Sequence, residues 1–258
     1  MQTVDKAMKL LTLFSIKQPE IGLTELSRLS GYDKAATRRF LVALQEHDFI
    51  EQNPMTRAYR LGTGFLHLAK IREASFPLEK VIQAAVERLS QSTQETAHAT
   101  LLSDQRLVTL AVVFPSRANR VHLDIAEALP FHATASGMVY LAFAEPEAFK
   151  RLVSELKVYT PNTITDEKAL RMCIKDAREQ GYAMTADGYE HEVTGIAVPY
   201  FNAQGLAMGT LAVATPSPRM DETLAQAIRQ QLIKEARAVT LTLGGVIPVH
   251  FPLVSDGE

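Results

Sequence analysis

The first fifty residues place apolar side chains at intervals of three and four, the spacing that puts them on one face of a helix. One such stripe runs through Val4, Ala7, Met8, Leu11 and Phe14. Two further helical patterns follow over residues 23–30 and 33–47, with Gly31 between them. Because glycine adopts the left-handed conformation that commonly ends a helix, this spacing predicts three short helices with a tight turn between the last two.

The third of these segments has two unlike sides on a helical wheel of about 100 degrees per residue. Its apolar side carries Ala36, Thr37, Phe40, Leu41, Ala43 and Leu44. Its other side carries Lys34, Arg38, Arg39, Gln45 and Glu46. We expect the first side to pack in a core and the second to meet a charged partner. The alternative is a charged face that contacts only solvent.

A short hairpin is predicted directly after this helix. Residues 49–51 and 57–61 are apolar-leaning runs on either side of Asn53 and Pro54, a pair that favours a turn. Three helices followed by a hairpin, with basic residues on the outside, are typical of a winged helix-turn-helix. We therefore interpret residues 1–62 as a DNA-binding domain of this type.

The remaining pattern alternates between helical and extended segments. A linker helix is expected over residues 63–76, and Pro77 forces a break where a new helix begins. Strand patterns cover residues 96–102, 107–114, 193–201 and 207–214, and helical patterns cover 78–89, 166–180 and 224–243. This order predicts an α+β domain with an antiparallel sheet over residues 77–247. Two prolines and polar last residues favour a disordered tail over residues 248–258.

Composition agrees with two domains and with DNA as a partner. The chain has 258 residues, of which 47% are hydrophobic, enough to form more than one core. Its formal net charge is −2, but residues 1–70 carry ten Lys and Arg against seven Asp and Glu, whereas the remainder carries 17 against 22. A mildly basic N-terminal part on an acidic body suits DNA binding through the N-terminal part, with affinity gained by dimerisation.

Few residues point to catalysis or metal binding. Cys173 is the only cysteine, which excludes an internal disulfide and a multi-cysteine metal site. The seven histidines show no metal-binding spacing, Ser136 lacks the glycine pattern of a nucleophile elbow, and no phosphate-binding glycine loop occurs. We expect no catalytic residue, no metal and no cofactor. The alternatives are an enzyme site hidden in residues 77–247, or a winged helix that binds protein instead of DNA.

The sequence shows neither a targeting signal nor a membrane-spanning segment. The N-terminal helix contains the acidic Asp5, and no stretch of about twenty apolar residues occurs. We therefore expect a cytoplasmic protein with no membrane partner.

Several short segments occur in a specific order and spacing. In the N-terminal part these are residues 4–11, 23–26 with Gly31, 34–41 and 59–62. In the rest they are residues 95–98, 129–137, 160–165, 181–183, 196–199 and Gly205. Through them the chain resembles the IclR-type bacterial transcriptional regulators over roughly residues 2–245. The resemblance implies a winged helix-turn-helix joined to a GAF-like (profilin-like) domain. It also implies that the protein binds double-stranded operator DNA as a homodimer or a dimer of dimers. A small organic metabolite is expected to bind in the GAF-like domain and to alter the binding of DNA.

Nine residues are expected to contact DNA. Three near the start of the second helix of the pair are expected to read base edges in the major groove, namely Lys34, Ala35 and Arg38. Three more are expected to contact phosphates or the minor groove, namely Arg39, Arg57 and Arg60. The set is completed by Thr24, Thr37 and Tyr59. For Arg60, a pair with Glu51 across the hairpin is the alternative.

The resemblance also implies an effector pocket in the second domain. Its expected border consists of Thr134, Ala135, Ser136, Gly137, Met138, Asp187, Gly188, Gly195, Ala212 and Ala214. Strand alternation places Ala212 and Ala214 on the same face of the sheet. Relatives that bind small carboxylates such as glyoxylate or pyruvate tend to offer Ser or Cys at the positions of Gly195, Ala212 and Ala214.

These departures from the family pattern predict a larger or more apolar effector. Met138 and Gly188 also stand where a lysine and a glutamate are common, so a small oxyacid would leave polar groups uncompensated. We hypothesise an aromatic or extended-chain catabolite, with Thr134, Ser136 and Asp187 as its polar contacts. The alternative is that the small residues only permit tight packing of the sheet.

Overall fold

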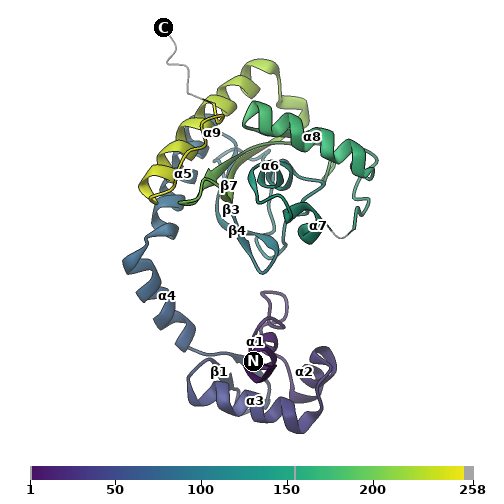
Figure 1. The fold of residues 1–258 in the computed structure, drawn as a ribbon, viewed down its shortest axis with the longest axis vertical. Coiled ribbons are helices and arrows are strands. Elements are labelled where there is room, and N and C mark those ends of the chain that lie inside the picture. The colour runs from purple at the N-terminus through teal and green to yellow at the C-terminus, as the bar shows by residue number, and fades with distance from the viewer. Residues whose placement is uncertain (1, 154, 253–258) are drawn as a thin grey trace. The chain divides into compact units, whose positions relative to one another are not determined.

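The computed structural model describes residues 2–153 and 155–252. Contacts divide the chain into two compact units, Met1–Phe76 and Pro77–Glu258. The first is a winged helix-turn-helix and the second is an α+β domain with an antiparallel sheet (Figure 1). Within the described residues, no helix has the length and apolar character needed to cross a membrane.

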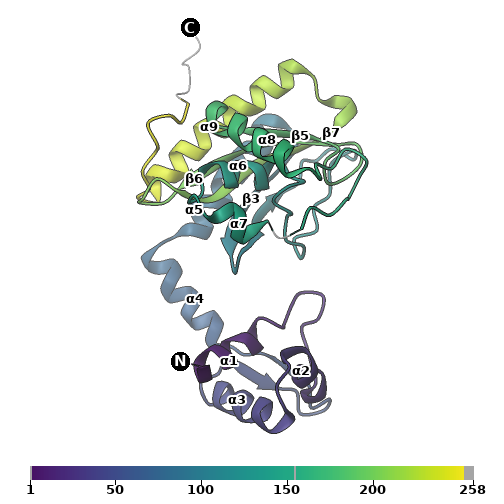
Figure 2. The same cartoon turned by 45° about the vertical axis from the view of Figure 1, so that its right-hand side comes forward.

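The first unit consists of three helices, a two-stranded hairpin and a further helix (Figure 2). Its elements are α1 (Gln2–Leu11), α2 (Leu23–Ser30), α3 (Lys34–Glu46), β1 (Ile50–Gln52), β2 (Tyr59–Leu61) and α4 (Gly64–Ser75). Gly31 ends α2 at φ 76°, in the left-handed region that favours glycine. Two residues later, the Asp33 side chain accepts a hydrogen bond from the Ala36 N–H at 2.8 Å and caps α3. The turn between α2 and α3 is therefore determined by local chemistry.

One core holds α1, α2, α3 and the β1–β2 hairpin together, and α4 contributes no buried residue to it. The buried residues of this core are Leu10, Ile21, Leu26, Phe40, Leu41, Leu44, Ile50 and Tyr59. Ile21 and Tyr59 exchange backbone hydrogen bonds of 2.9 Å, which fasten the segment before α2 to the hairpin. The expected burial of Ala43 was wrong: this residue is exposed, because it lies at the edge of the apolar side of α3.

The second unit is built around a five-stranded sheet in the order β4-β3-β7-β6-β5, and all neighbouring strands are antiparallel. The strands are β3 (Thr96–Ser103), β4 (Arg106–Val113), β5 (Ala183–Ala186), β6 (Val193–Phe201) and β7 (Ala207–Pro216). The helices are α5 (Leu78–Thr93), α6 (Ala135–Phe143), α7 (Ala148–Leu152), α8 (Glu167–Gln180) and α9 (Glu222–Thr242).

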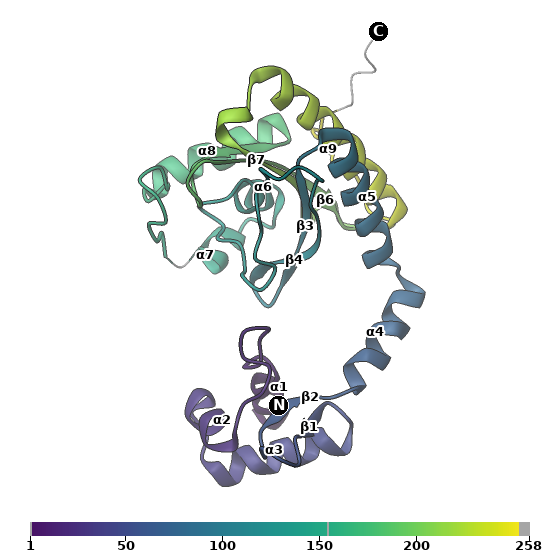
Figure 3. The same ribbon diagram turned by 180° about the vertical axis from the view of Figure 1, so that it is seen from behind.

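The helices cover the two faces of the sheet unequally. α5 and α9 lie side by side on one face, as Figures 1 and 3 both show. α6 packs on the other face against β6 and β7, and α8 packs on α6. Because side chains alternate along a strand, each central strand sends one set of residues to α5 and α9 and the other set to α6.

The helix α6 was not anticipated from the sequence, and neither were β5 and α7. All nine residues of α6 are buried. A helix that is apolar on every side shows no amphipathic period, so its pattern cannot be distinguished from that of a buried strand. Its position between sheet and α8 explains the uniform burial.

The end of the described chain corrects the expectation of a disordered tail over residues 248–258. Phe251 is 3% exposed, and its ring lies 5.1 Å from that of Phe201 and 6.0 Å from that of Phe143, measured between ring centroids. Arg237 also donates a hydrogen bond of 3.2 Å to the Pro252 carbonyl. The chain is therefore fastened at Phe251, which fills an aromatic cluster, whereas Val249 and His250 before it are exposed. Residues 253–258 lie outside the described residues.

Candidate functional site

The exposed side of α3 carries the basic residues at its N-terminal end. Lys34, Ala35 and Arg38 are all exposed. Within residues 2–153 and 155–252, neither Lys34 nor Arg38 makes an ion pair or a side-chain hydrogen bond. The burial of Phe40, Leu41 and Leu44 on the opposite side fixes which way this face points. These side chains are thus free to reach a partner.

The arginines expected to contact phosphate differ in their surroundings. The Arg39 guanidinium is exposed and lies 5.7 Å from the centroid of the Phe40 ring. Arg57 is exposed at the turn of the hairpin, with φ 60°. Arg60 instead donates two hydrogen bonds of 3.1 Å to Glu51 and lies 3.6 Å from Glu20. The pair with Glu51 is therefore present, and it offsets much of the Arg60 charge.

Two members of the expected DNA-contacting set belong to the core. Thr37 is fully buried, and its hydroxyl donates to the Asp33 carbonyl at 2.9 Å. Tyr59 is 6% exposed and packs in the core of the first unit. Their side chains face inward because each occupies a buried position of its helix or strand, so we withdraw both as DNA contacts. Thr24 is exposed in the first turn of α2.

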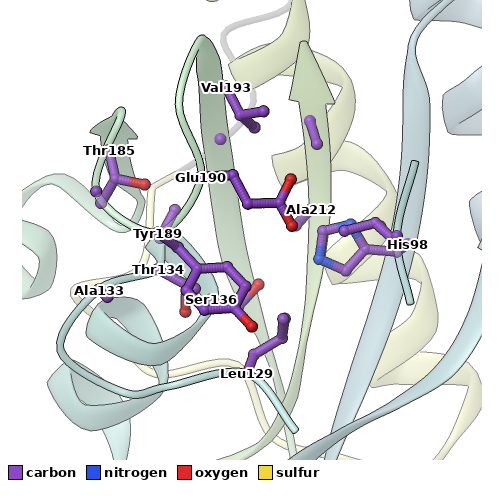
Figure 4. A pocket seen from close by; sticks show the side chains of 15 residues that line it. His98, Leu129, Ala133, Thr134, Ser136, Thr185, Tyr189, Glu190, Val193 and Ala212 are labelled. Carbon is purple, nitrogen blue, oxygen red and sulfur yellow. The ribbon is translucent and has the colours of Figure 1, made fainter. Parts of the chain in front are cut away.

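The second unit contains a cavity of about 60 Å³ beside the N-terminus of α6, on the face of the sheet that α6 covers. Most of its wall is apolar or small, including Leu129, Val193 and Ala212, which Figure 4 shows, and also Leu123. On the sheet side, Ala212 and Ala214 of β7 lie in register with neighbouring residues of β3 and β6. Gly195 of β6 pairs with Ala214, and a methyl group added to Gly195 would lie 3.8 Å from the Ala135 Cβ. Small residues on the strands therefore leave the space under α6 open.

Seven of the ten expected border residues line this cavity, namely Thr134, Ala135, Ser136, Gly188, Gly195, Ala212 and Ala214. Gly137 does not, because it packs against the backbone of Phe131. Met138 lies on another side of α6, beside Cys173 and Met184. The Asp187 carboxylate accepts a hydrogen bond of 3.1 Å from the Ser217 hydroxyl and does not line the cavity. For these three residues, the expected position at the border was wrong.

The N-terminus of α6 presents hydrogen-bond donors to the cavity. The Thr134 hydroxyl accepts from the Gly137 N–H at 3.0 Å and donates to the Pro130 carbonyl at 2.8 Å, so its capping role occupies it. The bond from the Met138 N–H to the Thr134 carbonyl is the first that closes the helix, which leaves the N–H groups of Ala135 and Ser136 without an intrahelical partner. The Ser136 hydroxyl likewise makes no hydrogen bond to a described residue. Together with the helix dipole, these donors favour a negatively charged group.

Several residues that line the cavity were not singled out from the sequence. They are His98, Leu123, Leu129, Ala133, Thr185, Tyr189, Glu190 and Val193. Burial raises the pKa of Tyr189 to about 12, and its hydroxyl donates to Glu127 at 3.2 Å. Burial, followed by the charge of Glu127, also raises the pKa of Glu190. The polar alternation of Thr96, His98 and Thr100 on one face of a buried strand was the signal that could have found the histidine.

Chemistry other than binding finds little support in this geometry. Across the described residues, no group of three or more His, Cys, Asp or Glu side chains could hold a metal ion. The cavity is lined by Ser136 and His98, but neither ring nitrogen of His98 has a hydrogen-bond partner among the described residues, so the histidine is not positioned as a base on the serine hydroxyl. The arrangement is that of a small binding cavity.

Two family models match the chain. A model described as the IclR helix-turn-helix domain matches residues 3–54, and a model described as the C-terminal part of the bacterial transcriptional regulator IclR matches residues 74–241. Among curated proteins, the HTH-type transcriptional regulator XynR of Escherichia coli (strain K12) is 29% identical over 245 residues, which cover 94% of this chain and 97% of XynR.

Solved structures of similar proteins cover nearly the whole chain. A crystal structure described as an IclR transcriptional regulator from Silicibacter sp. TM1040 is 40% identical, covers 97% of this chain and 100% of its own, and gives a TM-score of 0.93. An IclR homologue from Microbacterium hydrocarbonoxydans, crystallised with 4-hydroxybenzoate, is 24% identical, covers 93% of this chain and 98% of its own, and gives a TM-score of 0.76. The second of these shows likeness of fold only.

Proposed function

Because this chain belongs to the IclR family of bacterial transcriptional regulators, we propose that α3 reads operator DNA and that a small apolar carboxylate in the cavity beside α6 modulates that binding. The chain is a DNA-binding regulator and not an enzyme, as its named relatives are. The observation that carries the effector proposal is the pair of N–H groups of Ala135 and Ser136 at the start of α6, which have no acceptor among the described residues and lie at a mostly apolar cavity.

The proposed DNA contacts fall into two groups. Lys34, Ala35 and Arg38 on α3 are proposed to contact base edges, because recognition helices present their N-terminal residues to the major groove. Arg39 and Arg57 are proposed to contact phosphates, with Thr24 at the start of α2. Arg60 contributes less than these two arginines, because Glu51 and Glu20 already neutralise it.

We expect Arg38→Ala and Arg57→Ala to weaken DNA binding in different ways. Loss of a base contact should cost about 1–3 kcal/mol at one operator position and leave binding to random DNA nearly unchanged. Loss of a phosphate contact should weaken all sequences alike and reduce the slope of log K against log salt by about 1. Fluorescence anisotropy with operator and scrambled duplexes at several salt concentrations measures both. Equal loss on both duplexes for Arg38→Ala would contradict its role in base reading.

The effector proposal rests on how the two parts of the cavity complement a ligand. A carboxylate placed at the N-terminus of α6 would accept hydrogen bonds from the N–H groups of Ala135 and Ser136 and from the Ser136 hydroxyl. The wall of Leu123, Leu129 and Ala212 would cover an apolar body. 4-Hydroxybenzoate, with which the Microbacterium homologue was crystallised, is an example of an acid with these two parts.

The small residues of the sheet favour a ligand whose part opposite the carboxylate is apolar, and not one with a second polar group there. Gly195, Ala212 and Ala214 offer no hydroxyl or thiol, so a polar group held against them would lose its hydration without compensation. An aromatic or extended apolar carboxylate meets this condition better than a two- or three-carbon oxyacid does. Of the polar contacts first hypothesised, Ser136 stays in the proposal, whereas the Thr134 hydroxyl and Asp187 are held by other groups.

The test measures operator binding with and without ligand. We expect benzoate and its substituted relatives to change the affinity for DNA from the protein's own promoter region by about 5-fold or more, the scale of ordinary allosteric coupling. Gly195→Val, which places two further methyl groups beside Ala135, should abolish the response and leave DNA binding intact. Tight binding of glyoxylate or pyruvate in calorimetry, with none of the aromatic acids, would overturn the proposal.

We include assembly and location in the proposal. The first unit exposes apolar side chains on α1 and α4, including Val4, Met8, Leu66 and Ile71, which supports a homodimer or a dimer of dimers. A dimer would also bind DNA more tightly than one mildly basic domain can, because two domains contact more phosphates. Sedimentation equilibrium of the full chain distinguishes these states. Operator DNA as the partner favours action in the cytoplasm.

A further inference from the structure

His98 is buried without a hydrogen-bond partner. The residue is 5% exposed, and neither Nδ1 nor Nε2 meets a donor or acceptor among the described residues. Its neighbours on the same face of β3 differ in this respect. The Thr96 hydroxyl donates to the Val121 carbonyl at 2.7 Å, and the Thr100 hydroxyl pairs with that of Thr210 at 2.7 Å. Buried polar groups nearly always have a hydrogen-bond partner, so an unpaired buried imidazole indicates a place where a ligand can supply one.

The position of His98 shows where that partner can come from. β3 lies between β4 and β7, and His98 stands in register with Val112 on one side and Ala212 on the other. These two residues have no polar side-chain atoms to offer. The imidazole belongs to the wall of the cavity beside α6, and Figure 4 shows its ring turned towards the space that Ser136 and Leu129 also border. A partner for the imidazole can therefore reach it from the cavity, which Glu190 also lines without a hydrogen bond to the ring.

The chemistry of the ring narrows the kind of partner. Burial lowers the pKa of His98 to about 4, so the ring is neutral at physiological pH. A neutral imidazole offers one donor and one acceptor and carries no charge to attract a carboxylate. A hydroxyl group can pair with either nitrogen, because it both donates and accepts. The anionic end of a ligand is better served at the N-terminus of α6.

We propose that His98 hydrogen-bonds a neutral hydroxyl group on the effector, so that the cavity selects small apolar carboxylates that carry a hydroxyl over those that lack it. This selection rests on the carboxylate site proposed above. Ser136 and the start of α6 hold the charged end, the apolar wall covers the body, and His98 reads the substituent. An acid that lacks the hydroxyl displaces water from the cavity but gives the imidazole no hydrogen-bond partner. Such an acid therefore binds more weakly.

The test uses pairs of acids that differ only in the hydroxyl group, with 4-hydroxybenzoate against benzoate as the aromatic pair and 6-hydroxyhexanoate against hexanoate as the extended aliphatic pair. Calorimetry on the full-length protein should show that the hydroxylated member of at least one pair binds tenfold to a hundredfold more tightly, which corresponds to about 1.4–2.8 kcal/mol. In His98→Leu this ratio should fall to about one, with binding of the unsubstituted acid retained. In His98→Asn, which keeps a donor and an acceptor, part of the ratio should remain.

The outcomes separate the two proposals. Equal binding of both members of a pair, or a ratio that survives in His98→Leu, overturns the role of His98 and leaves the carboxylate site standing. Failure of every acid to bind the wild-type protein overturns both. We expect His98→Leu to fold, because leucine replaces an unpaired buried polar group. If it does not, the ring 15N signals of the wild-type protein decide: a hydroxylated acid should shift those of His98 and the unsubstituted acid should not.

Discussion

Gly137→Ala is expected to destabilise the second unit by about 3 kcal/mol or more, beyond the usual cost of one extra methyl group. A Cβ on Gly137 would lie 2.6 Å from the carbonyl carbon of Phe131 and closer still to its Cα and oxygen. These are backbone atoms, so no change of rotamer relieves the overlap. α6 would have to move away from the segment before it, and the donors of Ala135 and Ser136 would move with it. The proposed effector site should therefore be lost together with stability.

Urea unfolding of the full chain, followed by circular dichroism, measures this loss. Gly195→Ala is the matched control in the same cavity, because its Cβ would lie 3.8 Å from both Ala135 and Thr185, an ordinary contact distance. It should change the free energy of unfolding by less than about 1 kcal/mol, since alanine in a strand also restricts the unfolded chain. Comparable unfolding midpoints for the two variants would show that α6 tolerates displacement and would contradict the close packing described here.

Arg219→Ala should cost about 3–5 kcal/mol, because it leaves a buried carboxylate without its main partner. The Glu95 side chain is 1% exposed, and Arg219 donates two hydrogen bonds to it, at 2.6 and 2.8 Å. A further bond of 3.1 Å joins Arg219 to the Asn119 carbonyl, in the loop that carries Leu123 to the cavity wall. Arg117, at 3.7 Å from Glu95, replaces only part of the interaction.

Thermal or urea unfolding again provides the measurement, and an exposed pair provides the control. Lys175 lies 3.7 Å from Glu179 on α8, and both side chains are largely exposed, so Lys175→Ala should cost no more than about 0.5 kcal/mol. The double variant Glu95→Gln, Arg219→Ala should recover part of the stability, because the stranded charge is removed. A loss for Arg219→Ala as small as that of the control would mean that solvent reaches Glu95.

Much of the fold followed from local signals. Asp33 and Gly31 marked the limits of α2 and α3, and Asp166 and Gly181 those of α8, because capping chemistry depends on residues near in sequence. The hairpin β6–β7 was predicted from two apolar runs around residues 202–205. α6 escaped because every one of its sides is buried, which removes the periodicity on which such predictions depend.

The candidate sites show the same division. The basic face of α3 could be predicted, since it depends on one helix and its wheel. Thr37 and Tyr59 could not be assigned correctly by resemblance, because only the packing of α3 and β2 shows that their side chains point inward. His98 is one of seven histidines scattered along the chain, and their spacing sets none of them apart. The importance of His98 comes from its two ring nitrogens, which are buried without a hydrogen-bond partner among the described residues. A sequence does not show whether a side-chain nitrogen is paired.

The sequence by itself determined the class of protein: the order of helices, hairpin and strands, the uneven distribution of charge, and the family segments all lie along the chain and need no contact to be recognised. Only the tertiary structure decided which side chains are available. Arg60 forms ion pairs with Glu51 and Glu20. The Thr134 hydroxyl caps α6, and the Phe251 ring packs in an aromatic cluster. Each of these outcomes depends on groups brought together from distant positions or on the orientation of one side chain, because hydrogen bonding and burial are properties of neighbours in space.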